Sequence, residues 1–537
     1  MSYPFTLYDS YLKEKVEISE KTVLQPGVVN MYSCGPTVYY FQHIGNVRAA
    51  WLPDTIAKTA AIAGWKVNWV SNITDVGHLV GDGDDGEDKL EAGAKRENKK
   101  VEEIVQFYTN DYRKQCTALH IDLPVGDKNP KATEYIEEQM LLALTLLKDN
   151  KAYVTDDGIY LNFNQVEQFF NTHEDTISPQ LKHILATQKR QQKGNNSTFT
   201  GREIVDSEKK SGLDFALWKF VDEQSLQKWK FTDFVSVADL IHEIPADDRL
   251  NAWGAPGWHS ECVCMISQTI GHKLFSSISS LKQDNTIAEI DIHTGGEDHI
   301  DVHHKNEIIQ SEALGFNLSR FWVHNKFVMV DGGKMSKSLG NVYVITGLKK
   351  DTGFESIEEH GFTPLAYRLM LMEHHYSEQL NFTWEKLEQS QTRLNNLKKD
   401  VAAIRFFAEH KADGVTGEKT VSEKQKQALL NYLLDNLNTP KFVEKFQEVV
   451  TQTVSEMNKS GSLNARNVAA IELWEREFLQ LDLLPTIPED VLNLAQKRAV
   501  AKQEKNWAVA DTLRNEAKQA GYQIDDYVWG WGVWKVG

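Results

Sequence analysis

The sequence contains little cysteine and no long apolar run. Four cysteines in 537 residues are too few for the disulfide framework of a small secreted protein. No uninterrupted apolar stretch reaches the roughly 18 residues that a membrane-spanning helix needs. The first residues, MSYPFTLYDSYLKEKVEI, lack the charged start and apolar core of a secretory signal. These absences predict a cytoplasmic protein with no membrane partner, whose reduced thiols are available for metal binding or catalysis.

Basic charge is also scarce. The formal net charge is −17, which argues against a protein that coats nucleic acid in general, because such proteins are basic. A local basic face is not excluded. Hydrophobic residues make up 41% and charged residues 25% of the chain, as in ordinary globular proteins. Since one core stops growing at roughly 250–300 residues, a chain of this length predicts about two to four domains.

The pattern of apolar residues predicts an α/β domain that is split by an insertion. Residues 28–34 read as a buried strand, 47–64 as a helix and 66–73 as a second strand. This order is a βαβ unit, which opens a parallel sheet with a ligand crevice at the carboxyl ends of its strands. A second set of strands and a helix follows at 287–333. The two sets are separated by a long insertion.

Beyond Pro364 the pattern becomes helical. Apolar residues recur at helical spacing, and a last helical segment, Val491–Ala520, carries several lysines and arginines. The tail that follows contains Trp529, Trp531 and Trp534. We therefore expect a Rossmann-like domain in two halves at 1–120 and 246–345, an insertion at 121–245, an α-helical bundle at 346–485 and a small C-terminal region at 491–537.

Two short motifs could receive a nucleotide. HIGN, residues 43–46, lies between the first strand and the first helix, and helix N-termini attract anions. Gly45 lets a phosphate approach the backbone, and His43 can donate a hydrogen bond to it. HTGGEDH, residues 293–299, ends a predicted strand, so its glycines and Asp298 could meet a ribose. Taken separately, each motif also fits an ordinary turn.

A third motif, KMSKS at 334–338, places two lysines three residues apart. Lysine is a compact charge on a long stem and a common phosphate ligand. Without further context, a loop of this composition is typical of solvated surface charge.

Four residues could hold a metal ion. His303 and Glu307 are spaced i, i+4 on one helix face, Cys34 ends the first strand, and Cys262 lies in GWHSEC. Two thiolates, one imidazole and one carboxylate suit a tetrahedral zinc ion. The neighbours Cys264 and His304 are alternative ligands.

The order of these motifs resembles the class I aminoacyl-tRNA synthetases and, within them, the cysteinyl-tRNA synthetases. The resemblance covers nearly the whole chain and is carried by YSCGPTVYYFQHIGNVR (32–48), SNITDVGH (71–78), LDFALWK (213–219), APGWHSEC (255–262), the GGEDH-to-NE run, KFVMVDGGKMSKSLGN (326–341), LDNLNTPKFV (434–443) and residues 498–526. HIGN and KMSKS indicate the class, and the set Cys34, Cys262, His303 and Glu307 indicates the cysteine family.

The resemblance implies an ATP-dependent ligation of L-cysteine to tRNA(Cys) through a cysteinyl adenylate. The catalytic residues that it implies are His43, Asn46, Lys334 and Lys337. The ATP-binding residues are Gly45, Gly295, Gly296, Asp298 and Lys337. Trp258 and Thr74 would bind the amino acid. The four metal ligands would hold one Zn²⁺ per chain, which would select the substrate thiol. Mg²⁺ would accompany ATP. The chain is expected to be a monomer, and its C-terminal region to read the anticodon, where tail tryptophans could stack on bases.

The chain departs from the family at several positions. Asn46 stands at the fourth position of a motif often written HIGH, and it can donate a hydrogen bond but carries no charge. Residues 221–250 and 272–287 are longer than expected, and Lys305 replaces an acidic residue beside the metal ligands. Two other functions fit parts of the sequence. One is a cysteine-activating ligase that acts on an amino sugar, and the other is a tRNA-binding protein without catalysis.

Overall fold

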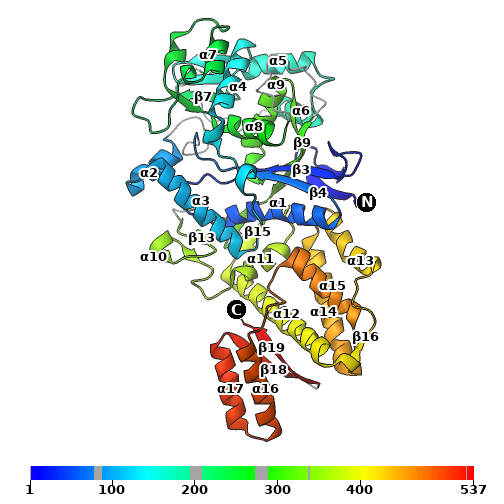
Figure 1. Cartoon of the computed structure of the whole chain (residues 1–537). Coiled ribbons are helices and arrows are strands. Elements are labelled where there is room, and N and C mark those ends of the chain that lie inside the picture. The colour runs from blue at the N-terminus through cyan, green and yellow to red at the C-terminus, as the bar shows by residue number, and fades with distance from the viewer. Residues whose placement is uncertain are drawn as a thin grey trace.

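The structure is a computed structural model that describes residues 2–77, 87–193, 209–271, 288–336, 339–527 and 529–536. Figure 1 shows an elongated molecule built in tiers. The insertion lies at one end, the sheet that carries β3, β4 and β9 lies next to it, a group of long helices follows, and a small C-terminal unit lies at the other end. Within the described residues no helix is both long and apolar enough to cross a lipid bilayer.

A four-stranded parallel sheet forms the centre of the chain, as the sequence predicts. Its strand order is β10-β9-β3-β4. The bounds of these strands are β3 (Val28–Ser33), β4 (Lys66–Ser71), β9 (Ala288–Gly296) and β10 (Asn317–Asn325). Two strands come from each half of the sequence, so the insertion separates in sequence what the sheet joins in space.

Helices cover both faces of this sheet (Figure 1). On one face lies α1 (Ile44–Ile62), and on the other lie α8 (Trp258–Thr269) and α9 (His303–Ala313). The helical hairpin α2 (Lys89–Glu97) and α3 (Val101–Ala118) projects to one side. Because helices cover both faces of the sheet, eight of the nine residues of β9 are buried. Its polar Asp291 is compatible with burial because its carboxylate accepts hydrogen bonds from the backbone N–H groups of Leu24, at 2.7 Å, and Asn30, at 2.8 Å.

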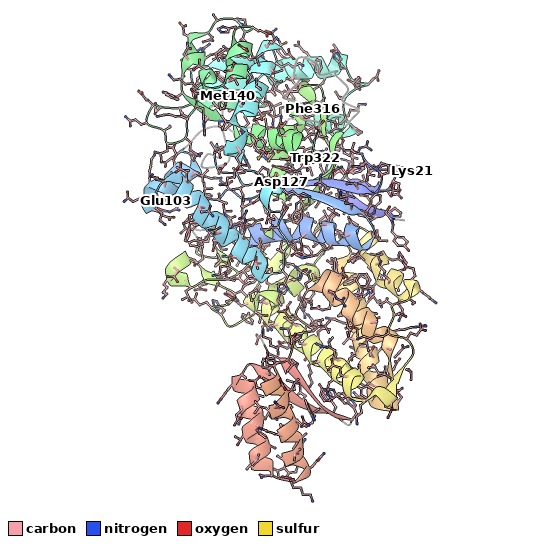
Figure 2. The ribbon with its side chains drawn as sticks, viewed as in Figure 1. Lys21, Glu103, Asp127, Met140, Phe316 and Trp322 are labelled. Carbon is pink, nitrogen blue, oxygen red and sulfur yellow. The ribbon has the colours of Figure 1, made fainter. Side chains whose placement is uncertain are left out.

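The insertion contains a separate antiparallel sheet of order β5-β6-β7-β8. Its elements are α4 (Ile136–Lys148), β5 (Ala152–Thr155), β6 (Gly158–Leu161), α5 (Phe163–Thr172), α6 (Pro179–Lys193), β7 (Ala216–Phe220), α7 (Val235–Ile241) and β8 (Gly254–Pro256). Strand β8 pairs with β7 although it lies beyond residue 245. Met140, Phe316 and Trp322, labelled in Figure 2, share one hydrophobic core that joins the insertion to the sheet.

Helices dominate the chain after the sheet. The bounds of this part are β11 (Val328–Val330), β12 (Gly333–Lys334), β13 (Tyr343–Val344), α10 (Lys349–Thr352), β14 (Glu355–Ser356), α11 (Pro364–Met372), β15 (Leu380–Phe382), α12 (Trp384–His410), β16 (Val415–Thr416), α13 (Glu423–Leu434), α14 (Thr439–Ser460), β17 (Leu463–Asn464) and α15 (Ala465–Trp474). Trp51 of α1, Met370 of α11 and Phe442 of α14 belong to one continuous core. The helical part therefore packs directly beneath the helix that carries HIGN.

A buried arginine connects these parts. Arg48 of α1 is 1% exposed, and its guanidinium donates hydrogen bonds to the backbone oxygens of Phe327, at 2.9 Å, and Glu378, at 2.7 Å. Phe327 immediately precedes β11, and Glu378 precedes β15, which pairs with β11. The HIGN helix is thus tied to the strand that leads into KMSKS.

Two elements differ from the sequence predictions. The segment predicted as one helix at 491–520 is two helices, α16 (Glu489–Gln503) and α17 (Trp507–Gln519), followed by the hairpin β18 (Tyr522–Tyr527) and β19 (Gly530–Lys535). The break occurs because Lys505 has a left-handed backbone (φ 59°) and Asn506 caps the second helix. The N-terminal hairpin β1 (Phe5–Asp9) and β2 (Glu14–Ile18) was not predicted.

Candidate functional site

A cavity of about 430 Å³ lies where the strands of the parallel sheet end. Its wall includes segments that follow β3, β4, β9 and β10, as expected for the crevice of a parallel sheet. Most of the predicted site residues line it, namely Cys34, His43, Gly45, Asn46, Thr74, Trp258, Cys262, Gly296, Asp298, His303 and Lys334. Among the described residues, Gly295 and Glu307 are not part of the lining. Lys337 lies outside the described residues.

The four predicted metal ligands form one group. Donor atoms of Cys34, Cys262, His303 and Glu307 all lie within 4.8 Å of one another. The two Sγ atoms are 3.8 Å apart, too far for a disulfide bond of about 2.05 Å. His303 Nε2 lies 3.0 Å from Glu307 Oε1, because the i, i+4 spacing on α9 turns both side chains to one side.

The electrostatics of this group suit a cation. Burial would raise the pKa of the Cys262 thiol, but the contacts with Cys34 and His303 outweigh it and lower that pKa to about 6. Burial also opposes ionisation of Glu307, yet His303 and His293 hold its carboxyl pKa well below its usual range. The pKa of the Cys34 thiol is raised by burial and by the neighbouring Cys262. These shifts favour the thiolate form of Cys262 and the carboxylate form of Glu307. A bound metal would also favour loss of the Cys34 thiol proton.

The residues present fit zinc. Glu307 is fully buried, and neither of its oxygens accepts a well-aligned hydrogen bond although imidazole nitrogens lie 3.0 and 3.1 Å away. A buried carboxylate with unsatisfied oxygens is costly unless it has a further partner. Two sulfurs, one nitrogen and one oxygen form a donor set that zinc accepts.

Further histidines surround the group, and sequence reasoning missed most of them. His293 Nε2 lies 3.1 Å from Glu307 Oε2, and His304 Nε2 lies 3.2 Å from Cys34 Sγ. His304 Nδ1 is 2.7 Å from His324 Nε2. His304, proposed from sequence as an alternative ligand, therefore contacts the group, and it joins two other possible donor sets, one with Cys34 and His299 and one with His293 and Glu307.

Cys264, the other alternative, is in no donor set of the described residues and is buried in the core of the insertion side. A signal for the missed histidines exists in the strands. His293 in β9 and His324 in β10 lie near the carboxyl ends of two parallel strands, where side chains gather around the crevice.

His43 caps helix α1. Its Nδ1 accepts hydrogen bonds from the backbone N–H groups of Gly45, at 3.1 Å, and Asn46, at 3.3 Å. The Asn46 side chain accepts in return from the His43 N–H, at 3.1 Å, which completes a capping box. Because Nδ1 accepts, the proton of a neutral His43 ring lies on Nε2, where it can be donated. The uncharged Asn46 thus has a defined structural role at the fourth HIGN position.

Lys334 reaches the cavity from the other side. Its Nζ lies 5.8 Å from the ring centroid of Phe327. Asn341 contacts the first half of the KMSKS motif, since its Oδ1 accepts from Ser336 N–H, at 2.8 Å, and its Nδ2 donates to the Lys334 oxygen, at 3.3 Å. The backbone of Lys334 and Ser336 is therefore held by one side chain.

The glycines of GGEDH have different surroundings. A Cβ at Gly295 would lie 2.7 Å from His304 and 2.8 Å from His299, so the histidines require a glycine there. A Cβ at Gly296 would lie 2.4 Å from the Asp298 carboxylate, so Gly296 leaves space for that side chain at the cavity.

Trp258 and Thr74, which the resemblance implies as amino-acid-binding residues, both line the cavity. The Trp258 ring stacks on the His303 ring with centroids 4.3 Å apart and planes 19° from parallel. Thr74 is buried, and its Oγ1 accepts a hydrogen bond from Asn72 Nδ2 at 3.1 Å. Both side chains therefore have defined contacts on the cavity wall, and Trp258 lies against one of the four predicted metal ligands.

Comparison with known proteins identifies the family. Residues 20–392 match the family described as tRNA synthetases class I (C) catalytic domain. The cysteine–tRNA ligase 1 of Burkholderia lata is 31% identical over 529 residues, which cover 97% of this chain and 95% of that protein. This chain belongs to the cysteine–tRNA ligase family. The resemblance drawn from the motifs is thereby confirmed, and the chain is an enzyme of the class I aminoacyl-tRNA synthetases.

Other members of the cysteine–tRNA ligase family are similar over their whole length. The protein of Treponema denticola is 31% identical and covers 95% of this chain and 96% of its own. That of Caldicellulosiruptor saccharolyticus is 30% identical and covers 99% of each chain. A solved structure, Mycobacterium tuberculosis methionyl-tRNA synthetase in complex with methionyl-adenylate, has a TM-score of 0.47 and 11% identity and covers 88% of this chain and 84% of its own.

The tail tryptophans pack on the protein. Trp534 is 6% exposed and donates from Nε1 to Asp525 at 2.6 Å, so it offers no open face to a base. Trp529 stacks on Tyr527 and Trp531 packs on Phe406 of α12.

Trp507, at the start of α17, is instead 59% exposed. Sequence reasoning missed it because a tryptophan in a helical segment is expected to be buried.

Proposed function

We propose that the chain ligates L-cysteine to tRNA(Cys) with ATP, through a cysteinyl adenylate. The observation that carries this proposal is the sharing of one cavity by two kinds of site. Cys34, Cys262 and His303 line one part of it, and His43 and Lys334 line another. A thiol and a triphosphate bound to these parts would be neighbours.

In the first step the cysteine carboxylate would attack the α-phosphorus of ATP, and the bond to pyrophosphate would break. His43 would donate its Nε2 proton as a hydrogen bond to a phosphate oxygen, aided by the N-terminus of α1. Lys334 would stabilise the charge that develops on the pyrophosphate, and the sequence predicts the same role for Lys337. Mg²⁺ would be bound to the same phosphates. Asp298, with Gly295 and Gly296, would bind the adenosine. Because no protein nucleophile is needed, positioning and charge stabilisation would supply most of the rate.

We infer that Cys34, Cys262, His303 and Glu307 hold one zinc ion. Zinc, when bound, would supply a soft Lewis acid that prefers a thiolate to a hydroxyl. An apolar pocket separates substrates that differ by a methylene or hydroxyl by only about 10- to 200-fold, whereas a directly engaged polar group can reach roughly 10⁴–10⁵. Selection of the thiol here would make a separate editing site unnecessary. Trp258 and Thr74 would position the rest of the amino acid.

In the second step a terminal ribose hydroxyl of the tRNA would attack the carbonyl carbon of the adenylate, and AMP would leave. The helical part at 346–485 would support the tRNA, and the C-terminal region at 491–537 would bind the anticodon. Trp507 is exposed and follows the exposed Lys505 by two residues, a combination suited to stacking on an unpaired base and contacting its phosphate. We propose a monomer in the cytoplasm, where the four free thiols would stay reduced.

A charging assay with radiolabelled cysteine tests this function. We expect label to become attached to tRNA(Cys) and to depend on ATP. A tRNA with a different anticodon should be charged poorly. If ATP is consumed with cysteine but no tRNA is charged, a ligase acting on another acceptor, such as an amino sugar, would replace this proposal. If cysteine is not activated but tRNA binds, the chain would be a tRNA-binding protein without catalysis.

A further inference from the structure

One wall of the cavity has no role in binding cysteine or ATP as described above. It is formed by the turn between β3 and α1 and by the first residue of α2, and its members are Tyr39, Tyr40, Phe41 and Lys89. The second reaction step brings a third substrate to the same cavity while the adenylate occupies the other walls. The terminal nucleotide of the tRNA must then approach along a wall that the first two substrates leave open.

Aromatic rings and a cation meet on this wall. Lys89 Nζ lies 5.8 Å from the centroid of the Tyr39 ring, near the limit of about 6 Å for a cation–π attraction. Both side chains are partly exposed. A ring and a positive charge therefore lie side by side on the cavity wall. The chain as a whole is strongly acidic, so a lysine at the cavity is of particular use to an anionic substrate.

Helix α2 holds this wall in place. Arg96 donates from Nη2 to the backbone oxygen of Tyr39 at 3.0 Å, and its guanidinium lies 4.5 Å from the centroid of the Tyr40 ring. A Cβ at Gly93 would lie 3.2 Å from the same Tyr39 oxygen, so the glycine permits close packing of the helix on the turn. Tyr40 also stacks on Tyr108 of α3, with centroids 5.9 Å apart. Tyr39 and Lys89 are therefore presented by a packed support.

We propose that Tyr39 and Lys89 receive the unpaired 3′ end of the tRNA. Single-stranded RNA is typically bound by stacking of bases on aromatic rings and by cations that contact the phosphates. Tyr39 offers the ring and Lys89 the cation at the mouth of the reacting cavity. Tyr40 and Arg96 act as positioning residues that hold the turn. This inference rests on the proposed function, since it assigns the place where the acceptor enters.

The test separates the two reaction steps. In Tyr39→Ala and Lys89→Ala we expect single-turnover transfer of cysteine from preformed adenylate to tRNA to fall about 5- to 100-fold, the range expected for loss of one stacked base or phosphate contact. Cysteine-dependent ATP–pyrophosphate exchange should fall at least fivefold less than transfer. Tyr39→Phe keeps the aromatic ring, so its rate of cysteine transfer should be close to the wild-type rate. Lys99→Ala is the matched control, because Lys99 Nζ lies 5.0 Å over the Phe107 ring and does not line the cavity.

Binding of shortened tRNA supplies a second readout. Removal of the unpaired 3′ nucleotides should weaken binding to the wild-type enzyme and should have no further effect in Tyr39→Ala. Equal loss of exchange and transfer would assign the wall to ATP or cysteine and overturn the inference. Unchanged transfer in both variants would leave Tyr39 and Lys89 with packing roles only. Absence of exchange and charging in the wild-type enzyme would instead refute the proposed function.

Discussion

His43 has two separable roles, and replacing it by asparagine or alanine distinguishes them. Its Nδ1 accepts two backbone N–H groups at the start of α1, and loss of such a cap costs about 0.5–2 kcal/mol. Its Nε2 proton is proposed to stabilise phosphate charge, and loss of one such donor slows a reaction by about 10²–10³. Asparagine is among the best N-cap residues. His43→Asn should therefore keep the free energy of unfolding within about 0.5 kcal/mol while exchange falls about 10²–10³.

His43→Ala removes the cap as well. We expect the same loss of exchange and an additional loss of about 1 kcal/mol in the free energy of unfolding, measured by urea denaturation. Exchange in His43→Asn within threefold of the wild-type rate would refute the phosphate role. Equal stability of the alanine and asparagine variants would refute the capping role.

Three further predictions follow from the site and its support. Cys262→Ser should lower zinc content, measured by elemental analysis, and reduce discrimination against serine toward about 10- to 200-fold; unchanged zinc content would contradict the ligand assignment. Removal of residues 491–537 should leave pyrophosphate exchange but weaken charging, and equal survival of both would contradict the anticodon assignment. Burial raises the pKa of Glu475 to about 7. Since this folded-state pKa exceeds the usual 4.5, wild-type stability should fall as pH rises from about 5 to 8. Glu475→Gln keeps an oxygen that can accept from the N–H groups of Leu481 and Leu483. It should remove up to about 3 kcal/mol of that pH dependence, measured as the free energy of unfolding in urea. The same change in unfolding free energy with pH for the wild-type and variant proteins would refute the assignment.

The parallel sheet was predictable because its strands have a strong local signal. Strands β3, β4 and β9 appear within a few residues of their expected ranges, since sheets buried on both faces require near-continuous apolar runs. The hairpin of β1 and β2 was missed because its turn places Lys13 in the left-handed region (φ 61°), where glycine or asparagine would have marked a turn.

The candidate site was predictable only in part. The i, i+4 pair His303 and Glu307 follows from helix geometry alone, but Cys34 and Cys262 are 228 positions apart, and no local pattern brings them together. Their proximity follows from the order of strands in the sheet, to which the family resemblance was the only guide. The roles of individual side chains depended on packing. The Trp534 side chain is buried and donates a hydrogen bond to Asp525, whereas Trp507 is exposed at the start of a helix.

The most direct test of the central claim is ATP–pyrophosphate exchange with cysteine and with serine, on protein whose zinc has been counted. The proposed function predicts about one zinc ion per chain and exchange that prefers cysteine by roughly 10⁴ or more. A folded, zinc-loaded protein that shows no cysteine-dependent exchange, or exchanges equally with serine, would contradict it.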